Sequence, residues 1–202
     1  MSASAQIQIR RRRSYAPTRW KNGGGITHEA IRMPAGADAY RWRVSVAEIA
    51  ASGAFSDFSG YQRRMVLLGG AGLRLRFSNG EQTLLRHAGD LAAFDGALQT
   101  QCELLAGPCT DLNLVAANSL EIVETEVRRL AAPLTLRRQP GQTIVLFSID
   151  GGVMVEQEAG ESAELELWDL AVLSGAAGAA AIRPCADRPT TASVFLAKLS
   201  GY

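Results

Sequence analysis

The sequence of 202 residues predicts an all-β fold with two related antiparallel barrels in one chain. Short runs such as Leu73-Arg74-Leu75-Arg76-Phe77 alternate apolar and polar residues, and this period of two between glycine turns is typical of strands. In addition, the second half of the chain repeats turn residues of the first half at a spacing of about 80 residues. Strand-rich units of this size are typical of sandwiches or barrels.

Four groups of residues carry the repeat. The groups 80 residues apart are Gly72–Leu75 with Gly152–Val155 and Gly80–Glu81 with Gly160–Glu161, and those 79 apart are Asp90–Ala92 with Asp169–Ala171 and Gly96 with Gly175. Gly and Asp are common turn residues, so the constant spacing is more informative than any single match. We therefore expect an N-terminal barrel over 1–118, which holds the ligand site, and a C-terminal barrel over 119–202.

The first elements are a strand over Gln6–Ile9 and a strand that follows the run Trp20-Lys21-Asn22-Gly23-Gly24-Gly25. The four arginines at 10–13 are interpreted as a solvated strand end, where charge discourages association between sheets. Three successive glycines allow close approach of another backbone or a ligand. The residues after them alternate like a strand, whereas a phosphate loop requires a helix there and a Lys after the glycines.

The next predicted strand, Tyr40–Ile49, has two different faces. Trp42, Val44 and Val46 point one way, whereas Arg43, Ser45 and Ala47 point the other way. A polar site and a half-solvated sheet would both produce this pattern. The strands Met65–Leu68 and Leu73–Phe77, joined by glycines, are predicted to form a hairpin.

The segments between and after the repeats are also strand-rich. Asp111 and Asn113 share one face of a short strand after the turn at Gly107-Pro108 and are candidate site residues. The segment 119–130 fits a helix through Leu120, Val123, Val127 and Leu130, and a strand through Val123, Thr125 and Val127. The all-β context favours the strand. Residues 142–150 are β-branched or apolar and are expected in the second core.

Composition excludes several classes of function. The chain has 21 Lys+Arg and 20 Asp+Glu, and this balance argues against a nucleic-acid binder. Its three cysteines form no CxxC pair, which favours a reducing cytoplasm. The longest apolar stretch, 170–182, is too short to span a bilayer, and the N-terminus has no secretory signal. We therefore expect a cytoplasmic protein without membrane or nucleic-acid partners.

The sequence lacks the residue patterns that a metal site, a cofactor site or a nucleophilic catalyst requires. The two histidines, His28 and His87, lie far apart, and the cysteines have no ligand spacing, so no metal and no cofactor is expected. His28 and Glu29 are adjacent in a strand and therefore face opposite sides. No Gly-x-Ser-x-Gly elbow is present.

The remaining pattern is an anion pocket. Arg43 and Arg63 offer guanidinium forks that suit carboxylates. Neutral hydrogen bonds would come from Asn22, Thr27 and Asn113, and apolar walls from Trp20, Phe55 and Tyr61. The alternative is that both arginines pair within the fold with Asp57, Glu48 or Asp111, and residue types alone leave the two open.

Four ordered motifs between residues 15 and 118 resemble the HutD/Ves family. They are Trp20-Lys21-Asn22-Gly23-Gly24-Gly25-x-Thr27-x-Glu29, Trp42-Arg43-Val44-Ser45-Val46-Ala47, Gly53-x-Phe55-Ser56-x-Phe58 and Asp111-Leu112-Asn113-Leu114. The resemblance implies a cupin-like, RmlC-like jelly-roll bicupin and a link to histidine utilisation. It implies binding of a small anionic intermediate, such as formylglutamate or urocanate, that limits pathway induction. It implies no established catalytic activity.

The chain departs from the family pattern after Phe58. Where the family usually has Pro-Gly-Tyr-Asp-Arg, this chain has Ser59-Gly60-Tyr61-Gln62-Arg63, so the arginine is kept while Pro and Asp are replaced. Val115 also replaces a common Met. The ligand preference of this chain is therefore open. The region of Phe58–Arg63 also lacks the His-x-His and Glu of metal-binding cupins.

The expected function is non-catalytic binding of a small carboxylate. The expected ligand-binding residues are Trp20, Asn22, Thr27, Glu29, Arg43, Ser45, Tyr61, Arg63 and Asn113. Alternatives are a metal-independent isomerase or hydrolase of a sugar or amino-acid derivative, with Glu29 or His28 as base, and a stress-linked scaffold without ligand. A homodimer is left open.

Overall fold

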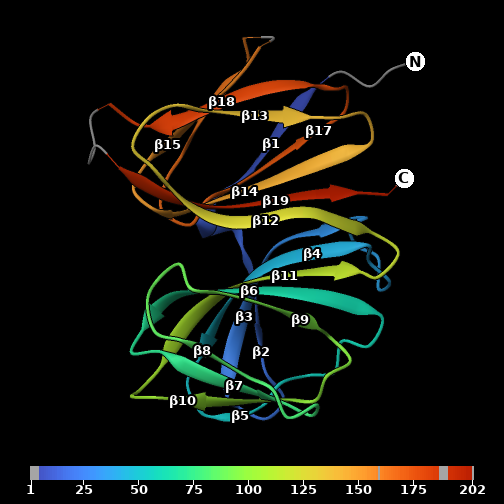
Figure 1. Cartoon of the computed structure of the whole chain (residues 1–202), viewed down its shortest axis with the longest axis vertical. Coiled ribbons are helices and arrows are strands. Elements are labelled where there is room, and N and C mark those ends of the chain that lie inside the picture. Colours follow the sequence, from blue (N-terminus) through green and yellow to red (C-terminus); the bar gives the residue numbers. More distant parts are fainter. Residues whose placement is uncertain (1–4, 159, 187–190, 202) are drawn as a thin grey trace. The chain divides into compact units, whose positions relative to one another are not determined.

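The computed structural model describes residues 5–158, 160–186 and 191–201, and almost all of its regular structure is β-strand (Figure 1). The one 3₁₀ helix in these ranges is η1 (Arg12–Ser14). All sheet pairings are antiparallel, so the predicted all-β fold is confirmed. The chain divides into two compact units, Tyr15–Ser119 and Leu120 onward with the residues up to Ser14. They are called the N-terminal and C-terminal barrels below.

The N-terminal barrel contains two sheets. The six-stranded sheet has the order β2 (Ala16–Arg19), β3 (Gly25–Met33), β4 (Trp42–Ile49), β11 (Cys109–Ala117), β6 (Tyr61–Gly70) and β9 (Leu91–Asp95). The four-stranded sheet has the order β5 (Gly53–Ala54), β10 (Thr100–Leu104), β7 (Leu73–Phe77) and β8 (Gln82–Leu85). Their facing apolar side chains, including Met65, Leu67, Leu73 and Leu75, form the core.

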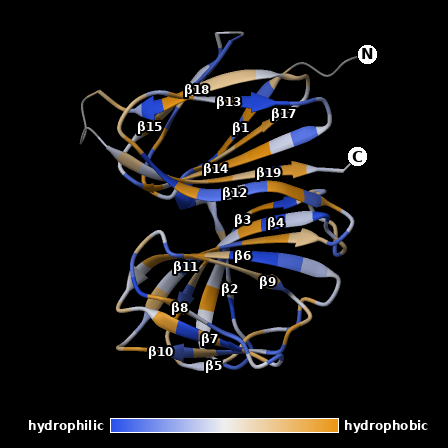
Figure 2. Cartoon of the chain, in the orientation of Figure 1, coloured by the Kyte–Doolittle hydropathy of each residue, from blue (hydrophilic) through white to orange (hydrophobic). Residues whose placement is uncertain are grey.

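The C-terminal barrel also contains two sheets. The five-stranded sheet has the order β1 (Gln6–Arg10), β17 (Leu170–Ser174), β14 (Gln142–Asp150), β19 (Ala192–Ser200) and β12 (Glu121–Leu130). The four-stranded sheet has the order β13 (Leu134–Arg138), β18 (Gly178–Pro184), β15 (Val153–Gln157) and β16 (Ser162–Leu165). Figure 2 shows β14 and β19 largely in hydrophobic colours, in accord with their buried residues.

The two barrels share one topology. The order β4-β11-β6-β9 corresponds to β12-β19-β14-β17, and the order β5-β10-β7-β8 corresponds to β13-β18-β15-β16. The repeated turn residues predicted this duplication because each lies at the same place in both copies. The copies differ at their edges, where β2 and β3 extend one large sheet and β1 extends the other.

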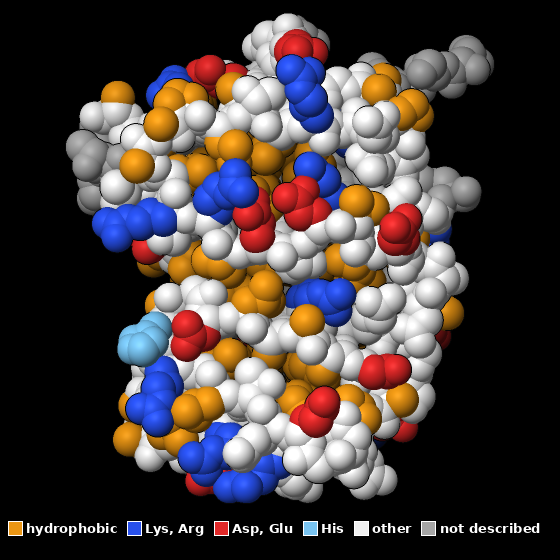
Figure 3. Space-filling model, viewed as in Figure 1, with side chains coloured by type: hydrophobic (Ala, Val, Ile, Leu, Met, Phe, Trp, Pro, Cys, Tyr) orange, Lys and Arg blue, Asp and Glu red, His pale blue; other side chains and the backbone are white. Residues whose placement is uncertain are grey.

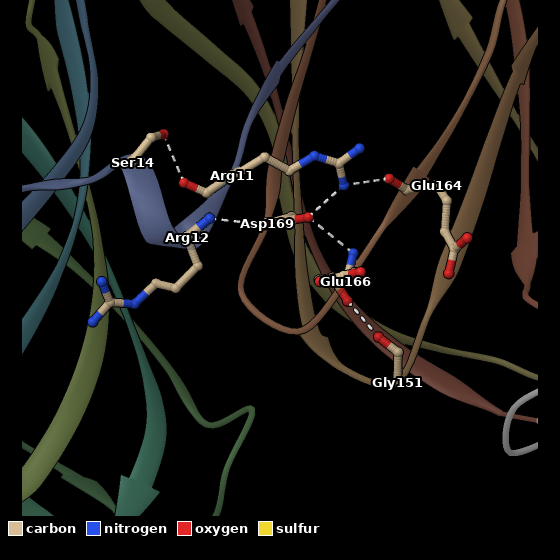
Figure 4. A network of polar contacts seen from close by, with 8 residues as sticks. Arg11, Arg12, Ser14, Gly151, Glu164, Glu166 and Asp169 are labelled. Atoms are coloured by element: carbon tan, nitrogen blue, oxygen red, sulfur yellow. Dashed lines mark hydrogen bonds and ion pairs between the residues drawn. The ribbon is translucent and has the colours of Figure 1, made fainter.

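Strand β1 lies outside the predicted division at residue 118. Gln6–Arg10 pairs with Leu170–Ser174, so the first described residues join the C-terminal barrel. Asp169, which is almost fully buried, fixes the residues that follow β1 (Figure 4). Its carboxylate accepts hydrogen bonds from Arg11 Nη1 at 2.7 Å and from the Arg12 backbone N–H at 2.8 Å. Local alternation could predict this strand but not its distant partner.

Two local expectations have different outcomes. The undecided segment 119–130 contains strand β12, as the all-β context favoured. The predicted hairpin of Met65–Leu68 with Leu73–Phe77 is wrong, because β6 pairs with β11 and β9 while β7 pairs with β10 and β8. Gly70 and Gly72 have φ near +100°, and a Cβ on Gly70 would lie 2.7 Å from Cys109 Sγ. The glycines make a corner between sheets.

The surface carries charges of both signs. On the face in Figure 3, Lys and Arg side chains are interspersed with Asp and Glu. Within the described ranges, no helix is long and apolar enough to cross a membrane.

Candidate ligand-binding site

A cavity of about 480 Å³ lies in the N-terminal barrel, on the inner face of the six-stranded sheet. It is lined by Thr18, Arg19, Trp20, Lys21, Asn22, Thr27, Arg43, Ser45, Ala47, Ala54, Phe55, Ser56, Phe58, Arg63, Asp111, Asn113 and Val115. Four of these side chains are cationic and one is acidic. The cavity is therefore suited to an anion.

The registers of β4, β11 and β6 bring the polar groups together. Arg43 and Arg63 both pair with Val115, so the two arginines lie on either side of it in one row. Ser45 pairs with Asn113 in the next row. Residues two apart in a strand share a face, which places both rows on the cavity wall.

Arg63 is the most constrained cation of the site, with 5% of its surface exposed. Its guanidinium carbon lies 5.2, 4.9 and 5.0 Å from the ring centroids of Phe55, Phe58 and Phe94. Its Nη2 donates a 2.6 Å hydrogen bond to Asn113 Oδ1, while its buried Nε has no partner among the described residues. Aromatic faces stabilise a cation and fix its plane, so the remaining N–H groups keep one orientation.

Asn113 links Arg63 to a buried acid. Asn113 Nδ2 donates to Asp111 Oδ2, and Asp111 is only 1% exposed. Burial raises the pKa of Asp111 to about 7, although the positive charge of Arg63 and the hydrogen bond from Asn113 oppose this rise. Burial also lowers the pKa of Arg63 to about 10, which leaves it charged at neutral pH.

Arg43 is the second cation of the row. Its guanidinium carbon lies 5.3 Å from the centroid of Tyr40 and 5.6 Å from that of Phe58, which therefore contacts both arginines. Arg43 Nη1 lies 3.8 Å from Glu29 Oε2, a carboxylate oxygen that also accepts a 2.8 Å bond from Arg32. The buried Nε of Arg43 has no partner in the described part of the chain. Arg43 lines the cavity, which places its guanidinium group beside a bound ligand.

The glycine run forms the turn between β2 and β3. Trp20 N–H donates to Gly25 O at 3.0 Å, and Asn22 Oδ1 accepts from Gly24 N–H at 3.0 Å. A Cβ on Gly25 would clash with the Glu48 carbonyl and lie 3.1 Å from the Trp20 ring, so glycine is required there. Trp20 Nε1 donates to Thr27 Oγ1 at 2.8 Å, which leaves the Thr27 hydroxyl proton for another acceptor.

Seven of the nine predicted ligand-binding residues line this cavity. They are Trp20, Asn22, Thr27, Arg43, Ser45, Arg63 and Asn113. Glu29 and Tyr61 are not among the lining residues. Glu29 pairs with Arg32, and the Tyr61 ring packs 4.9 Å from that of Tyr40.

The sequence analysis also considered residues that could act as a base or pair with the arginines. Of these residues, Asp111 lines the cavity. His28 Nε2 lies 2.9 Å from Glu48 Oε1. His28 follows Thr27 in the same strand, and because Thr27 lines the cavity, the side chain of His28 faces away from the cavity. Asp57 accepts hydrogen bonds from Ser59. Of the three suggested internal partners of the arginines, Asp111 is the one near Arg63, and Asn113 lies between them.

The predicted site omitted several residues that the structure brings to it. Phe58 and Phe94 hold the Arg63 guanidinium, and Asp111 completes the polar chain. Asp111 was a candidate because it shares a strand face with Asn113, but it was not included among the expected ligand-binding residues. Phe94 had none, since its contact with Arg63 depends on the pairing of β6 with β9.

Metal-ligand residues are dispersed over the described chain. Within residues 5–158, 160–186 and 191–201, no three His, Cys, Asp or Glu side chains gather in an arrangement that could hold a metal ion.

Comparisons with known proteins identify the family of this chain. A family model described as HutD matches residues 12–190. An uncharacterised 21.2 kDa protein in the hutC 3′ region of Pseudomonas putida is 34% identical over 177 residues, which cover 85% of this chain and 88% of that protein. Protein Ves of Citrobacter koseri is 41% identical over 69 residues, which cover 34% and 36% of the two chains.

Comparisons with solved structures point to the same family and to a similar fold. A conserved protein of unknown function from Pseudomonas aeruginosa PAO1 superposes with a TM-score of 0.86 at 30% identity, covering 97% of this chain and 100% of that one. HutD from Pseudomonas fluorescens SBW25, in a formate condition, gives 0.78 at 30% identity, covering 98% and 100%. Oxalate decarboxylase of Bacillus subtilis gives 0.64 at 10% identity, covering 96% and 77%. This last likeness concerns the fold alone, and the predicted cupin-like architecture is confirmed.

Proposed function

The chain belongs to the HutD family, which is linked to histidine utilisation, and from this premise we propose that its N-terminal barrel binds a small carboxylate metabolite and thereby limits that pathway. Formylglutamate and urocanate are the candidate ligands. The binding is proposed to be non-catalytic and cytoplasmic.

One observation carries the proposal: two arginines face one cavity with N–H groups that the protein leaves unused. Both arginines line the cavity, and Arg43 Nη1 lies 3.8 Å from Glu29 Oε2, which is beyond hydrogen-bond distance. A carboxylate between the two guanidinium groups would accept hydrogen bonds from their Nη groups. Charge-assisted bonds of this kind are also stronger than neutral ones.

The size and walls of the cavity fit a small metabolite. Its volume of about 480 Å³ lies within the range of about 300–1,000 Å³ typical of ligand pockets. Phe55 and Trp20 supply apolar contact, with their rings edge to face at 6.2 Å. We assign Arg43 and Arg63 to the carboxylate and Asn22 and Thr27 to its orientation. Lys21 and Arg19, which also line the cavity, add positive charge that favours anions.

The test is calorimetric titration of the full chain with N-formylglutamate and with urocanate. We expect binding in the micromolar to millimolar range. Arg63→Met keeps an apolar side chain between the aromatic rings but removes the cation. It should weaken binding by about 10- to 100-fold, since a hydrogen bond to a charged group contributes about 1.5–3 kcal/mol.

Arg138→Met is the matched control. Arg138 is also 5% exposed, also has an unpartnered buried Nε among the described residues, and lies in the C-terminal barrel. This variant should lose stability without losing affinity. The proposal is refuted if neither acid produces heat, or if Arg63→Met binds as tightly as the control.

A further inference from the structure

Asp111 has a carboxylate oxygen for which the protein provides no partner. Its Oδ2 accepts from Asn113, while Oδ1 is buried and unpartnered within the described residues. Asp111 nevertheless lines the cavity, in the row of Ala47, with the row of Ser45 and Asn113 between it and that of Arg43 and Arg63. A buried polar atom without a partner requires an explanation, and here the residue that carries it lines a candidate ligand site.

The charged and titratable groups around Asp111 come from four strands. Arg63 on β6 is the cation that acts on it most directly, and Arg43 on β4 interacts electrostatically with Arg63. Cys102 on β10 also interacts with Asp111, and burial raises the pKa of its thiol to about 12, so it stays neutral in the physiological range. Cys109 lies on the same strand as Asp111, and its Sγ donates to Gly72 O at 3.3 Å.

We propose that Asp111 takes up one proton when a carboxylate ligand occupies the cavity, so that the ligand binds as an anion beside a neutral Asp111 carboxyl group. This inference rests on the proposed function and adds a linkage to pH. The proton comes from solvent and resides on Asp111. The neutral carboxyl group of Asp111 then adds no second negative charge to the site.

The physical reason is the cost of two negative charges in one buried site. When two carboxylates share a site, the pKa of one of them rises strongly. A bound carboxylate adds a negative charge beside Asp111. It also neutralises part of the positive charge of Arg63 that stabilises the ionised form of Asp111. The pKa of Asp111 is already raised to about 7 by burial in the free protein, so a further increase moves it above physiological pH. The carboxyls of a free ligand such as N-formylglutamate titrate near pH 4 and stay ionised.

The sign of the pH dependence follows. Below about pH 7 Asp111 already carries the proton, and affinity should be independent of pH. Above pH 7 the free protein has lost the proton and must regain it on binding. The dissociation constant should therefore increase up to about tenfold per pH unit until the pKa of the bound state is reached.

The experiment is calorimetry of the full chain with N-formylglutamate at pH 8 in two buffers whose ionisation enthalpies differ. The difference in observed heat gives the number of protons taken up, and we expect close to one. Asp111→Asn keeps the shape of the side chain without a titrating group. It should show no proton uptake and a dissociation constant that does not vary between pH 6 and 9.

A matched control is His28→Gln. Histidines commonly titrate between pH 5 and 8, and His28 lies on the other face of β3 beside Glu48. This variant should keep the proton uptake of the wild type. Binding without proton uptake in the wild type would refute the linkage and leave the proposed function standing, as would proton uptake that persists in Asp111→Asn. No binding at any pH would refute both.

Discussion

The two barrels of the chain have the same strand order, but one has a buried polar chain where the other has apolar residues. Their pairing registers place Arg63 opposite Phe94 and Ile144 opposite Leu173, and these two partners hold equivalent places in β9 and β17. By the same registers Asn113 corresponds to Leu196 and Asp111 to Val194. Each member of the buried polar chain Arg63–Asn113–Asp111 therefore has an apolar counterpart.

This difference separates the requirements of the fold from those of the site. Ile144, Val194 and Leu196 belong to a continuous apolar core, and the corresponding space in that barrel is only about 70 Å³. The N-terminal barrel keeps a space of about 480 Å³ that four buried polar side chains line, those of Ser45, Arg63, Asp111 and Asn113. Buried ionic groups are costly unless every member is paired. We therefore infer that the polar chain serves the proposed ligand binding rather than stability.

The test with the largest expected effect replaces the buried polar chain of the N-terminal barrel by the apolar residues that occupy the same positions in the C-terminal barrel. Arg63→Ile alone should destabilise the protein by about 3–5 kcal/mol at pH 8, because it leaves Asp111 and Asn113 buried without the cation. The triple variant Arg63→Ile, Asn113→Leu, Asp111→Val copies the other barrel and should recover most of that loss. Urea unfolding measures both values.

The triple variant should at the same time bind no carboxylate. If it is as unstable as Arg63→Ile, the polar chain is needed for folding, and the distinction between the two barrels fails. A triple variant that still binds the ligand would place the site elsewhere.

A second difference concerns two equivalent aspartates, Asp90 and Asp169. Both accept a bond from the backbone of a residue three positions earlier, at His87 and Glu166, at 2.9 and 3.0 Å. Asp169 alone of the two also binds Arg11 and the Arg12 backbone, which fix the residues that follow β1 (Figure 4). The same turn residue has acquired a second role in one barrel.

Replacing each aspartate by alanine measures that second role. Asp169→Ala should cost about 3 kcal/mol, since it removes several bonds to a buried charge, whereas Asp90→Ala, with a side chain 37% exposed, should cost about 1 kcal/mol. Urea unfolding gives the energies, and amide exchange of β1 should accelerate only in Asp169→Ala. Equal losses would show that the contacts of Arg11 and Arg12 contribute nothing.

The sequence predicted the parts of this comparison that depend on local pattern. Strand alternation identified β4 and its two faces, and the repeated Gly72 and Asp90 revealed the duplication. Seven of the residues that line the cavity were predicted, because the motifs that resemble the family and the alternation along the strands selected the same residues. The corner after Gly70 was mistaken for a hairpin, because a glycine turn between two alternating strands looks the same whether they pair with each other or not.

Long-range pairing accounts for the rest. The partner of β1 is more than 150 residues away, and no local feature identifies it. The aromatic enclosure of Arg63 depends on Phe94 from β9 and on the loop that carries Phe58, which Gly96 allows to approach closely. Glu29 was predicted to face the ligand, but the bulge in β3 after it and the nearby Arg32 give it another partner.

The smallest difference between the barrels lies at Gly89 and Trp168, which precede the two aspartates. Both N–H groups donate 2.8 Å bonds to equivalent carbonyls, at Leu67 and Ser148, and both residues have positive φ, 96° and 62°. A side chain in this region costs about 1–2 kcal/mol. Trp168 offsets part of that cost, because Arg12 lies 5.9 Å from its ring centroid.

Exchanging the side chains tests this balance. Gly89→Ala should destabilise the protein by about 1 kcal/mol, since it adds strain without a compensating contact. Trp168→Gly should change stability by less than about 1 kcal/mol, because relief of strain is opposed by loss of the ring contact and by the greater freedom of the unfolded chain. Urea unfolding of both variants provides the measurement. A loss above about 2 kcal/mol in Trp168→Gly would mean that this ring fixes the N-terminal residues as firmly as Asp169 does.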